Sequence, residues 1–418
     1  MKKTISAVAP QRARAILNTM GESGAPPLEG LELVTVGLEE YLQVIEEEYL
    51  GRLLGEAGGS AFRLVQGSYG AGKTHFLSCV RSLAQKHGFL TCSVNLSPRE
   101  CPYQDALRVY QVAWANLSWR YRAGQRVGEG LNAEAEGEEL QVRGAEAILR
   151  LIAQGQVESE LAGPWGEIPV ENYTFRRVAG RLVEAYRQGR EEEAELLEHW
   201  LSGQAGSDRQ LLRQLGIYDE VASDNAFPIL RSLVALMTAL GFPGVVFLFD
   251  EVDIQISSAN AQQMRAIGDN LRQLIDLCAS SRLGKVIFFY ATPPEFMQVE
   301  VSAYPALQQR LARPLNMSKA SPQSVVIDLE GAQREPATFF KELGLKLLDL
   351  AQIAWSWDEP QRELQEANLG RLVDFMSQQV FSGGYRLFVK FWLALLQEQY
   401  ALQPHPLTEE RCEELLHN

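Results

Sequence analysis

Five short apolar runs punctuate the chain and carry the first prediction of its fold. Each is rich in branched and aromatic residues and is bounded by turn or helix signals. Continuous apolar runs, rather than alternating ones, are typical of parallel strands covered on both faces. Helical stretches separate them, so the pattern predicts an α/β fold with a five-stranded parallel sheet. The runs are Phe62–Val65, Leu90–Leu96, Val245–Phe249, Val286–Tyr290 and Val325–Leu329.

The gap between the second and third runs is too long for a single crossover helix. From about Arg120 to Asp224 the sequence is acidic and helical, with an apolar stripe that includes Phe175, Val178 and Leu182. We interpret about 120–225 as a helical insertion in the core.

Both ends of the chain are also predicted to be helical. Segments such as "FFKELGLKLLDLAQIAW" and "LFVKFWLALLQEQY" have amphipathic helical patterns after the fifth run. We therefore divide the chain into a lead-in helix at 1–35, a core at 36–335 and a C-terminal helical lid with a short tail at 336–418.

Composition narrows the class of protein. The 418 residues are 46% hydrophobic and 22% charged, which is ordinary for a globular protein with more than one domain. The formal net charge of −14 disfavours non-specific DNA binding by the isolated chain, although a local basic patch stays compatible with it. Five scattered cysteines without a C-x-x-C pair argue against a disulfide framework or a zinc site.

No targeting or membrane segment is predicted. No apolar run approaches the ~20 residues that span a bilayer. Gln11, Arg12 and Arg14 interrupt any signal-peptide apolar region near the N-terminus. We therefore expect a cytoplasmic protein without a membrane partner.

The stretch "VQGSYGAGKTHFL" carries the clearest chemical signal. Gly67, Gly72, Lys73 and Thr74 fit the spacing G-x-x-x-x-G-K-[ST] of a phosphate-binding loop. Glycines let backbone N–H groups converge on one anion, and the following helix adds its positive N-terminal end. Lys73 is expected to reach the β- and γ-phosphates of ATP, and the Thr74 hydroxyl to ligate Mg²⁺. The predicted nucleotide-binding residues are Gly67, Ser68, Tyr69, Gly70, Ala71, Gly72, Lys73, Thr74 and His75.

A second signal, "VVFLFDEVD", places two carboxylates at the end of the third apolar run. Ligands of open α/β folds bind beyond the carboxyl ends of the strands. Asp250 is therefore predicted to help hold Mg²⁺, and Glu251 to polarise the water that attacks the γ-phosphate. Together with the loop, the pair indicates ATP hydrolysis rather than binding alone.

Four further positions fit an oligomeric ATPase, each with a plainer structural alternative. Thr292 ends the fourth run and could contact the γ-phosphate or the attacking water, or simply form a turn. Arg310 and Arg313 could present a guanidinium to a neighbouring subunit's nucleotide, or lie at a surface helix end. Arg386 follows Gly383-Gly384 and could reach the nucleotide from the same chain.

The order of these motifs resembles the AAA+ ATPases, particularly the initiator-like branch with origin-recognition proteins and STAND-type ATPases. In that family a P-loop strand, an acidic strand, a polar sensor, a trans arginine and a lid arginine follow one another. The resemblance implies the sheet order 5-1-4-3-2 for the five runs, numbered along the chain, and a helical lid.

A closer resemblance comes from the segments "ARAILNTMGESGAPP", "FRLVQGSYGAGKTHFL" and "HWLSGQAGSDRQLLRQLGI". Together they are similar to the ATP-binding proteins of BREX bacteriophage-exclusion systems, in the BrxD-like group. The resemblance implies an ATP-dependent switch or loader in bacterial defence, acting as a homo-oligomer with other defence proteins such as a helicase-like ATPase. The alternatives are a motor or initiator acting directly on DNA, and a STAND-like regulatory ATPase with slow turnover.

Overall fold

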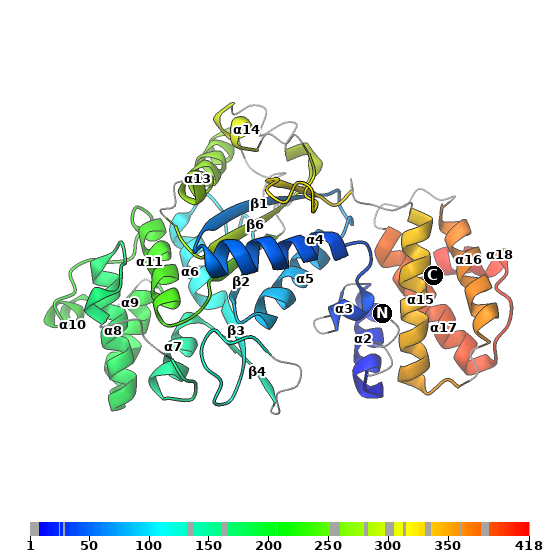
Figure 1. The fold of residues 1–418 in the computed structure, drawn as a ribbon, viewed down its shortest axis with the longest axis horizontal. Helices are drawn as coiled ribbons and strands as arrows, with labels where there is room; N and C mark the ends of the chain where they lie inside the picture. Colours follow the sequence, from blue (N-terminus) through cyan, green and yellow to red (C-terminus); the bar gives the residue numbers. More distant parts are fainter. Residues whose placement is uncertain are drawn as a thin grey trace. The chain divides into compact units, whose positions relative to one another are not determined.

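The computed structural model describes residues 8–24, 26–27, 30–99, 101–131, 138–159, 165–204, 206, 208–250, 260–279, 283–296, 305–311, 315–330, 336–358, 361–377 and 384–417 (Figure 1). The chain divides into two compact units. The loop unit comprises Met1–Leu42, Gln66–Cys79 and Asp328–Asn418, and the sheet unit comprises Gln43–Val65 and Val80–Ile327. Each unit contains residues that are far apart in sequence.

A seven-stranded sheet has the order β4-β3-β2-β5-β6-β1-β7. Strand β2 pairs in parallel with β5, and β5 with β6. The Lys285 amide, just before β6, donates to Gly59 O at 2.8 Å, and the Val245 amide donates to Lys285 O at 2.9 Å. Strands β1, β6 and β5 therefore start at the same edge. The bounds are β1 Ser60–Gln66, β2 Leu90–Asn95, β3 Leu117–Arg122, β4 Glu139–Arg143, β5 Val245–Asp250, β6 Val286–Thr292 and β7 Val326–Asp328.

The prediction of five parallel strands is wrong in number but right in the order of those five. The five apolar runs form β1, β2, β5, β6 and β7, which lie next to one another in the expected order. Two further strands, β3 and β4, extend the sheet beyond β2, and both pair antiparallel, so the sheet is mixed.

The two additional strands escaped prediction because neither of them is buried on both faces. In β3 the buried Trp119 and Tyr121 alternate with the more exposed Arg120 and Arg122. Strand β4 is mostly exposed. Their sequences therefore lack the continuous apolar run that marks a strand covered on both faces.

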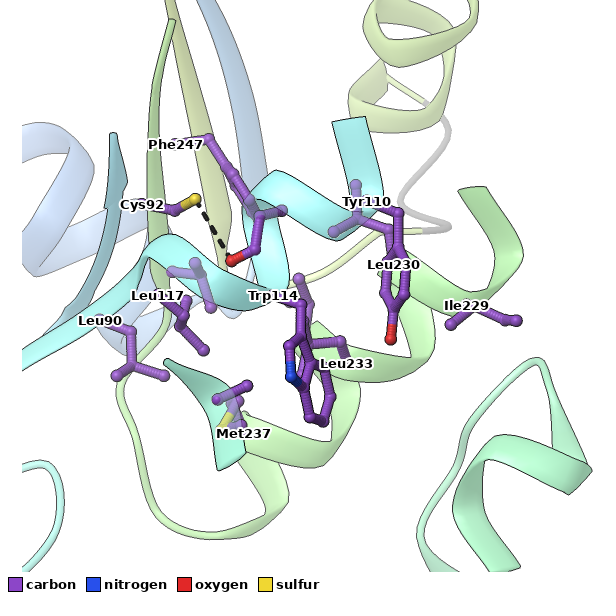
Figure 2. Packing of buried hydrophobic residues seen from close by; sticks show 14 of the residues in the cluster. Leu90, Cys92, Tyr110, Trp114, Leu117, Ile229, Leu230, Leu233, Met237 and Phe247 are labelled. Carbon is purple, nitrogen blue, oxygen red and sulfur yellow. Dashed lines mark hydrogen bonds between the residues drawn. The ribbon is translucent and has the colours of Figure 1, made fainter. Parts of the chain in front are cut away.

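Helices from the segment between β2 and β5 pack against β2 through large apolar side chains. Figure 2 shows two side chains of α6 against two of α11, with Tyr110 beside Leu230 and Trp114 beside Leu233. The Cys92 thiol of β2 donates to the Ala113 carbonyl of α6 at 3.6 Å. The helices of the sheet unit are α6 Ala106–Asn116, α7 Ala145–Ala153, α8 Tyr173–Gln188, α9 Glu191–Leu201, α10 Arg209–Gln214, α11 Ala226–Ala239, α13 Ala261–Ala279 and α14 Pro305–Leu311, with the 3-10 helix η2 Trp165–Glu167 and the π-helix η1 Ile45–Glu56.

In the loop unit, the N-terminal helix packs among the C-terminal helices. Helix α2 (Pro10–Ser23) contacts α15 (Pro336–Trp355) and α17 (Gly384–Leu402). At the centre of this bundle the buried Trp392 donates its indole N–H to Gly344 O at 2.9 Å. The other helices are α3 Leu31–Val34, α16 Arg362–Ser377 and α18 Glu409–His417, while α4 Glu39–Val44 begins in this unit and α5 Lys73–Lys86 runs from this unit into the other.

Among the helices that the structure describes, none combines the length and the apolar character needed to cross a bilayer.

Candidate nucleotide-binding site

The glycine-rich loop joins the end of β1 to the start of α5. Gly70 and Gly72 adopt φ values of 85° and 89°, the left-handed region that glycine reaches without strain. A Cβ at Gly67 would lie 2.9 Å from Ala71 Cβ, so a side chain does not fit there. The backbone is therefore shaped by the two glycines of the sequence motif, Gly67 and Gly72, together with Gly70 between them.

Lys73 folds back over this loop. Its side chain is buried, and Nζ donates to Gly67 O at 2.6 Å and to Ser68 O at 3.1 Å. These bonds hold a positive charge against the loop, beside the N-terminus of α5. Thr74 and Tyr69 of the same segment are exposed, Tyr69 at 71%.

A carboxylate that sequence analysis missed contacts the same loop. The Ser68 amide donates to Glu330 Oε1 at 2.9 Å, and the neighbouring Leu329 amide donates to Gln66 O at 2.9 Å. Glu330 follows strand β7, which lies beside β1 in the sheet. The loop and Glu330 are far apart in sequence. Only the predicted strand order, which places the first and fifth runs side by side, could have indicated this contact.

Behind the loop, His75 belongs to a polar cluster with Thr35 and Cys79. Its Nε2 lies 3.1 Å from Thr35 Oγ1 and 3.6 Å from Cys79 Sγ. The Thr35 hydroxyl donates its proton to Leu31 O at 2.7 Å. We therefore assign the imidazole proton to Nε2, which donates to Thr35 Oγ1.

Lys346 of α15 connects this cluster to the C-terminal helices. Its buried Nζ donates to the Thr35 carbonyl. Burial, and secondarily the Lys346 charge, lower the pKa of His75 to about 4, so its ring is neutral at pH 7. Burial also lowers the pKa of Lys346 itself and raises the pKa of Cys79 to about 11. Neither Thr35 nor Lys346 stood out in the sequence.

Arg386, predicted as the lid arginine, lies in the first turn of α17. Its side chain is exposed and makes no hydrogen bond or ion pair within the described ranges. Its backbone is close to Gly24, the residue that ends α2, where a Cβ would lie 2.8 Å from Arg386 O. The structure thus places Arg386 in the loop unit, together with Lys73 and His75.

Two other predicted residues lie at strand ends in the sheet unit. Half-buried Asp250 ends β5, and the Leu96 amide donates to its carbonyl at 2.9 Å. Thr292 ends the adjacent strand β6, is fully buried, and its Oγ1 has no hydrogen-bond partner among the described residues. Glu251 lies outside the described residues.

Of the two candidate trans arginines, Arg310 is described and Arg313 is not. Arg310 lies near the end of α14 and forms a bidentate pair with Asp276 of α13 through Nε and Nη2, with Nη2 2.9 Å from Oδ2. Its side chain is 31% exposed. Any contact of this arginine with a second subunit therefore competes with a carboxylate of its own chain.

The fold and the loop together define a class. An α/β protein in which a strand leads through a glycine-rich loop into a helix, with a lysine held over that loop, has the architecture of P-loop ATPases. The chain belongs to the family of BREX system ATP-binding proteins BrxC/D, which it matches over residues 8–397. The match confirms the predicted resemblance. None of the curated protein sequences matches the chain.

This membership covers most of the chain, including both candidate motifs. The protein is therefore an ATP-binding protein of a BREX defence system.

Proposed function

We propose that the protein hydrolyses ATP at the glycine-rich loop and uses the reaction as a switch within the defence system. The observation that carries the proposal is the loop itself, with its left-handed glycines and the Lys73 ammonium held over it. The family name supports the choice of ATP.

In this proposal the backbone amides of the loop and the N-terminus of α5 bind the phosphates. Lys73 exchanges its two carbonyl contacts for β- and γ-phosphate oxygens, which are stronger, charge-assisted partners. Mg²⁺ suits the oxygen donors of Thr74 and Asp250, which are a hydroxyl and a carboxylate, and would neutralise phosphate charge.

Glu251 is the proposed base that orients and polarises the attacking water, and Thr292 the polar group that senses the γ-phosphate. The buried hydroxyl of Thr292, which has no partner among the described residues, supports a polar ligand there, because a buried hydroxyl without a partner is costly. Arg386 is proposed to contact the nucleotide from the lid.

A trans arginine would make the site depend on assembly. We propose that Arg310 or Arg313 reaches the nucleotide of a neighbouring subunit, so that ATP favours an oligomer and hydrolysis releases it. Partner proteins of the same defence system would respond to this change.

Two variants test the proposal. Lys73→Ala should abolish ATP binding in calorimetry, since the loop loses its only lysine; unchanged affinity would discard the phosphate-binding role. Glu251→Gln should still bind ATP but release phosphate slowly, and its mass in solution should rise with ATP and Mg²⁺. Normal phosphate release by Glu251→Gln would assign the base elsewhere, and a monomer under all conditions would remove the trans arginine.

A further inference from the structure

One face of the sheet edge is polar, although the opposite face belongs to the core. Thr91 of β2 lies opposite Ser118 of β3, and Ser118 lies opposite Arg143 of β4, so the three share one face. Because alternate residues of a strand point to the same side, further polar side chains join them. This polar sheet face comprises Thr91, Ser93, Asn95, Ser118, Arg120, Arg122, Glu139, Gln141 and Arg143, of which Arg122 and Glu139 pair with each other.

Hydrogen bonds hold several of these groups in place. Gln141 Nε2 donates to Ser118 Oγ at 2.9 Å. Arg143 Nη2 donates to Asn116 Oδ1 at 2.6 Å, and Asn116 Nδ2 in turn donates to the Ser93 carbonyl at 2.9 Å. Arg143 is thereby positioned without a compensating negative charge.

Three arginines gather at this face. Arg120 and Arg143 are diagonal neighbours on the paired strands, and Arg81 of α5 lies close to Arg120. Within the described ranges none of the three has a carboxylate in ion-pair distance, whereas neighbouring Arg122 pairs with Glu139 at 3.1 Å. Burial, together with the like charge of Arg120, lowers the pKa of Arg81. In a chain of net charge −14, three such cations form a local site for an anion.

A cavity of about 1000 Å³ opens on this face. Its sheet end is lined by Arg81, Thr91, Ser93, Ser118, Gln141 and Arg143. The cavity continues over α6 to α9, where Glu195 and Glu198 give the opposite sign of charge. Glu198 is already engaged, with Oε1 3.1 Å from Arg150 Nη2. A bound anion is therefore confined to the sheet end.

We propose that the polar sheet face binds the phosphodiester backbone of a single nucleic-acid strand. Arginine, serine, threonine, asparagine and glutamine side chains are the usual donors to nucleic-acid phosphates. Arg143 lines the cavity and Arg120 is its diagonal neighbour on β3, so the two guanidinium groups can contact neighbouring phosphates. A concave site of this size takes a segment of one strand.

A protein partner fits the same surface less well. Protein interfaces depend on aromatic or aliphatic anchors near their centre, and the six side chains that line the sheet end include none. The strand site is separate from the proposed use of ATP, so the two proposals can fail independently.

The test is fluorescence anisotropy of a labelled, mixed-sequence single strand with the full chain, between roughly 50 and 200 mM salt. The double variant Arg120→Gln/Arg143→Gln should weaken binding about tenfold or more. It should also reduce the dependence of log affinity on log salt by about 1.4, because two phosphate contacts are lost. Arg187→Gln on α8 changes an exposed arginine that makes no hydrogen bond or ion pair with the described residues; it removes one positive charge elsewhere and should bind as the wild type does.

Circular dichroism and ATP calorimetry check that the double variant is folded. No binding by the wild type at the lower salt, or equal affinity of the double variant, would overturn the proposal. Competition by polyglutamate as effective as competition by unlabelled strand would also overturn it, in favour of an acidic protein partner. Equal affinity for duplex would overturn the choice of a single strand.

Discussion

The neutral His75 behind the phosphate-binding loop should make the folded protein sensitive to acid. Its pKa is lowered to about 4, from 6.5 in an unfolded chain, first by burial and then by the charge of Lys346. Between these two values the unfolded state binds the proton and the folded state does not. The free energy of unfolding therefore decreases as the pH falls through 6.5, and it stops decreasing below pH 4.

The full pKa shift of His75 corresponds to a loss of about 3 kcal/mol in the free energy of unfolding. About 2 kcal/mol of this loss occurs between pH 7 and pH 5. This is an upper bound, because the His75 side chain keeps some exposed surface while its Nε2 faces Thr35 and Cys79. His75→Gln removes the titration but keeps an N–H that can donate to Thr35 Oγ1.

Urea unfolding at pH 7 and pH 5 measures the effect. The wild type should lose up to about 2 kcal/mol more than His75→Gln between the two pH values, since the carboxylates titrate alike in both. The imidazole NMR signal that is missing in His75→Gln gives the pKa directly. Lys346→Met should raise that pKa, although burial should keep it below 6.5. A wild-type His75 that titrates near 6.5, or equal losses of stability in the two proteins, would refute the reasoning.

Three other predictions follow from contacts of single residues. Gly24→Ala should lower the unfolding free energy by about 1–3 kcal/mol and visibly lower the melting temperature, because φ is +64° and a backbone oxygen lies 2.8 Å from the added Cβ. Gly37→Ala, with φ +77° and open space, is its control and should cost only about 1–2 kcal/mol. Glu330→Gln should tighten ATP binding about two- to fivefold in calorimetry by removing a negative charge from the loop amide, and weaker binding would show that the carboxylate helps shape the loop. Asp276→Asn should promote ATP-dependent assembly, measured by mass in solution, because it removes the negative charge that pairs with Arg310; an unchanged mass would place the trans arginine elsewhere.

The sequence predicts best those strands whose apolar pattern has a single physical cause, which is burial on both faces. Strands β5 and β6 are covered on both faces, so apolar residues fill them and the runs stand out. Strands β3 and β4 keep one face polar, and their alternation was read as part of a helical insertion. These two unpredicted strands carry Arg120 and Arg143 of the proposed site for a nucleic-acid strand.

The candidate site likewise has one part that the sequence predicts and another part that it does not. A local motif predicts a glycine-rich loop between β1 and α5, where Gly70 and Gly72 take left-handed φ values and Lys73 folds over the loop. The contacts of these residues with phosphate stay a prediction. Glu330 and Lys346 reach the same unit from more than two hundred residues away, and no spacing rule connects them to the loop. Their contacts follow from tertiary packing, which periodicity does not encode.

Arg310 shows that a motif can predict the chemical role of a side chain without predicting whether that side chain is already paired within its own chain. Its place in the order of motifs suggests a guanidinium that faces outward to another subunit. The chain also supplies Asp276 from α13, whose two carboxylate oxygens accept from Nε and Nη2 of that guanidinium. The pair is partly exposed, and exposed pairs are worth roughly 0.2–1 kcal/mol, whereas a desolvated guanidinium–phosphate contact is several times stronger. In our proposal, the pair with Asp276 therefore holds Arg310 in a single chain and gives way when the nucleotide of a second subunit comes within reach.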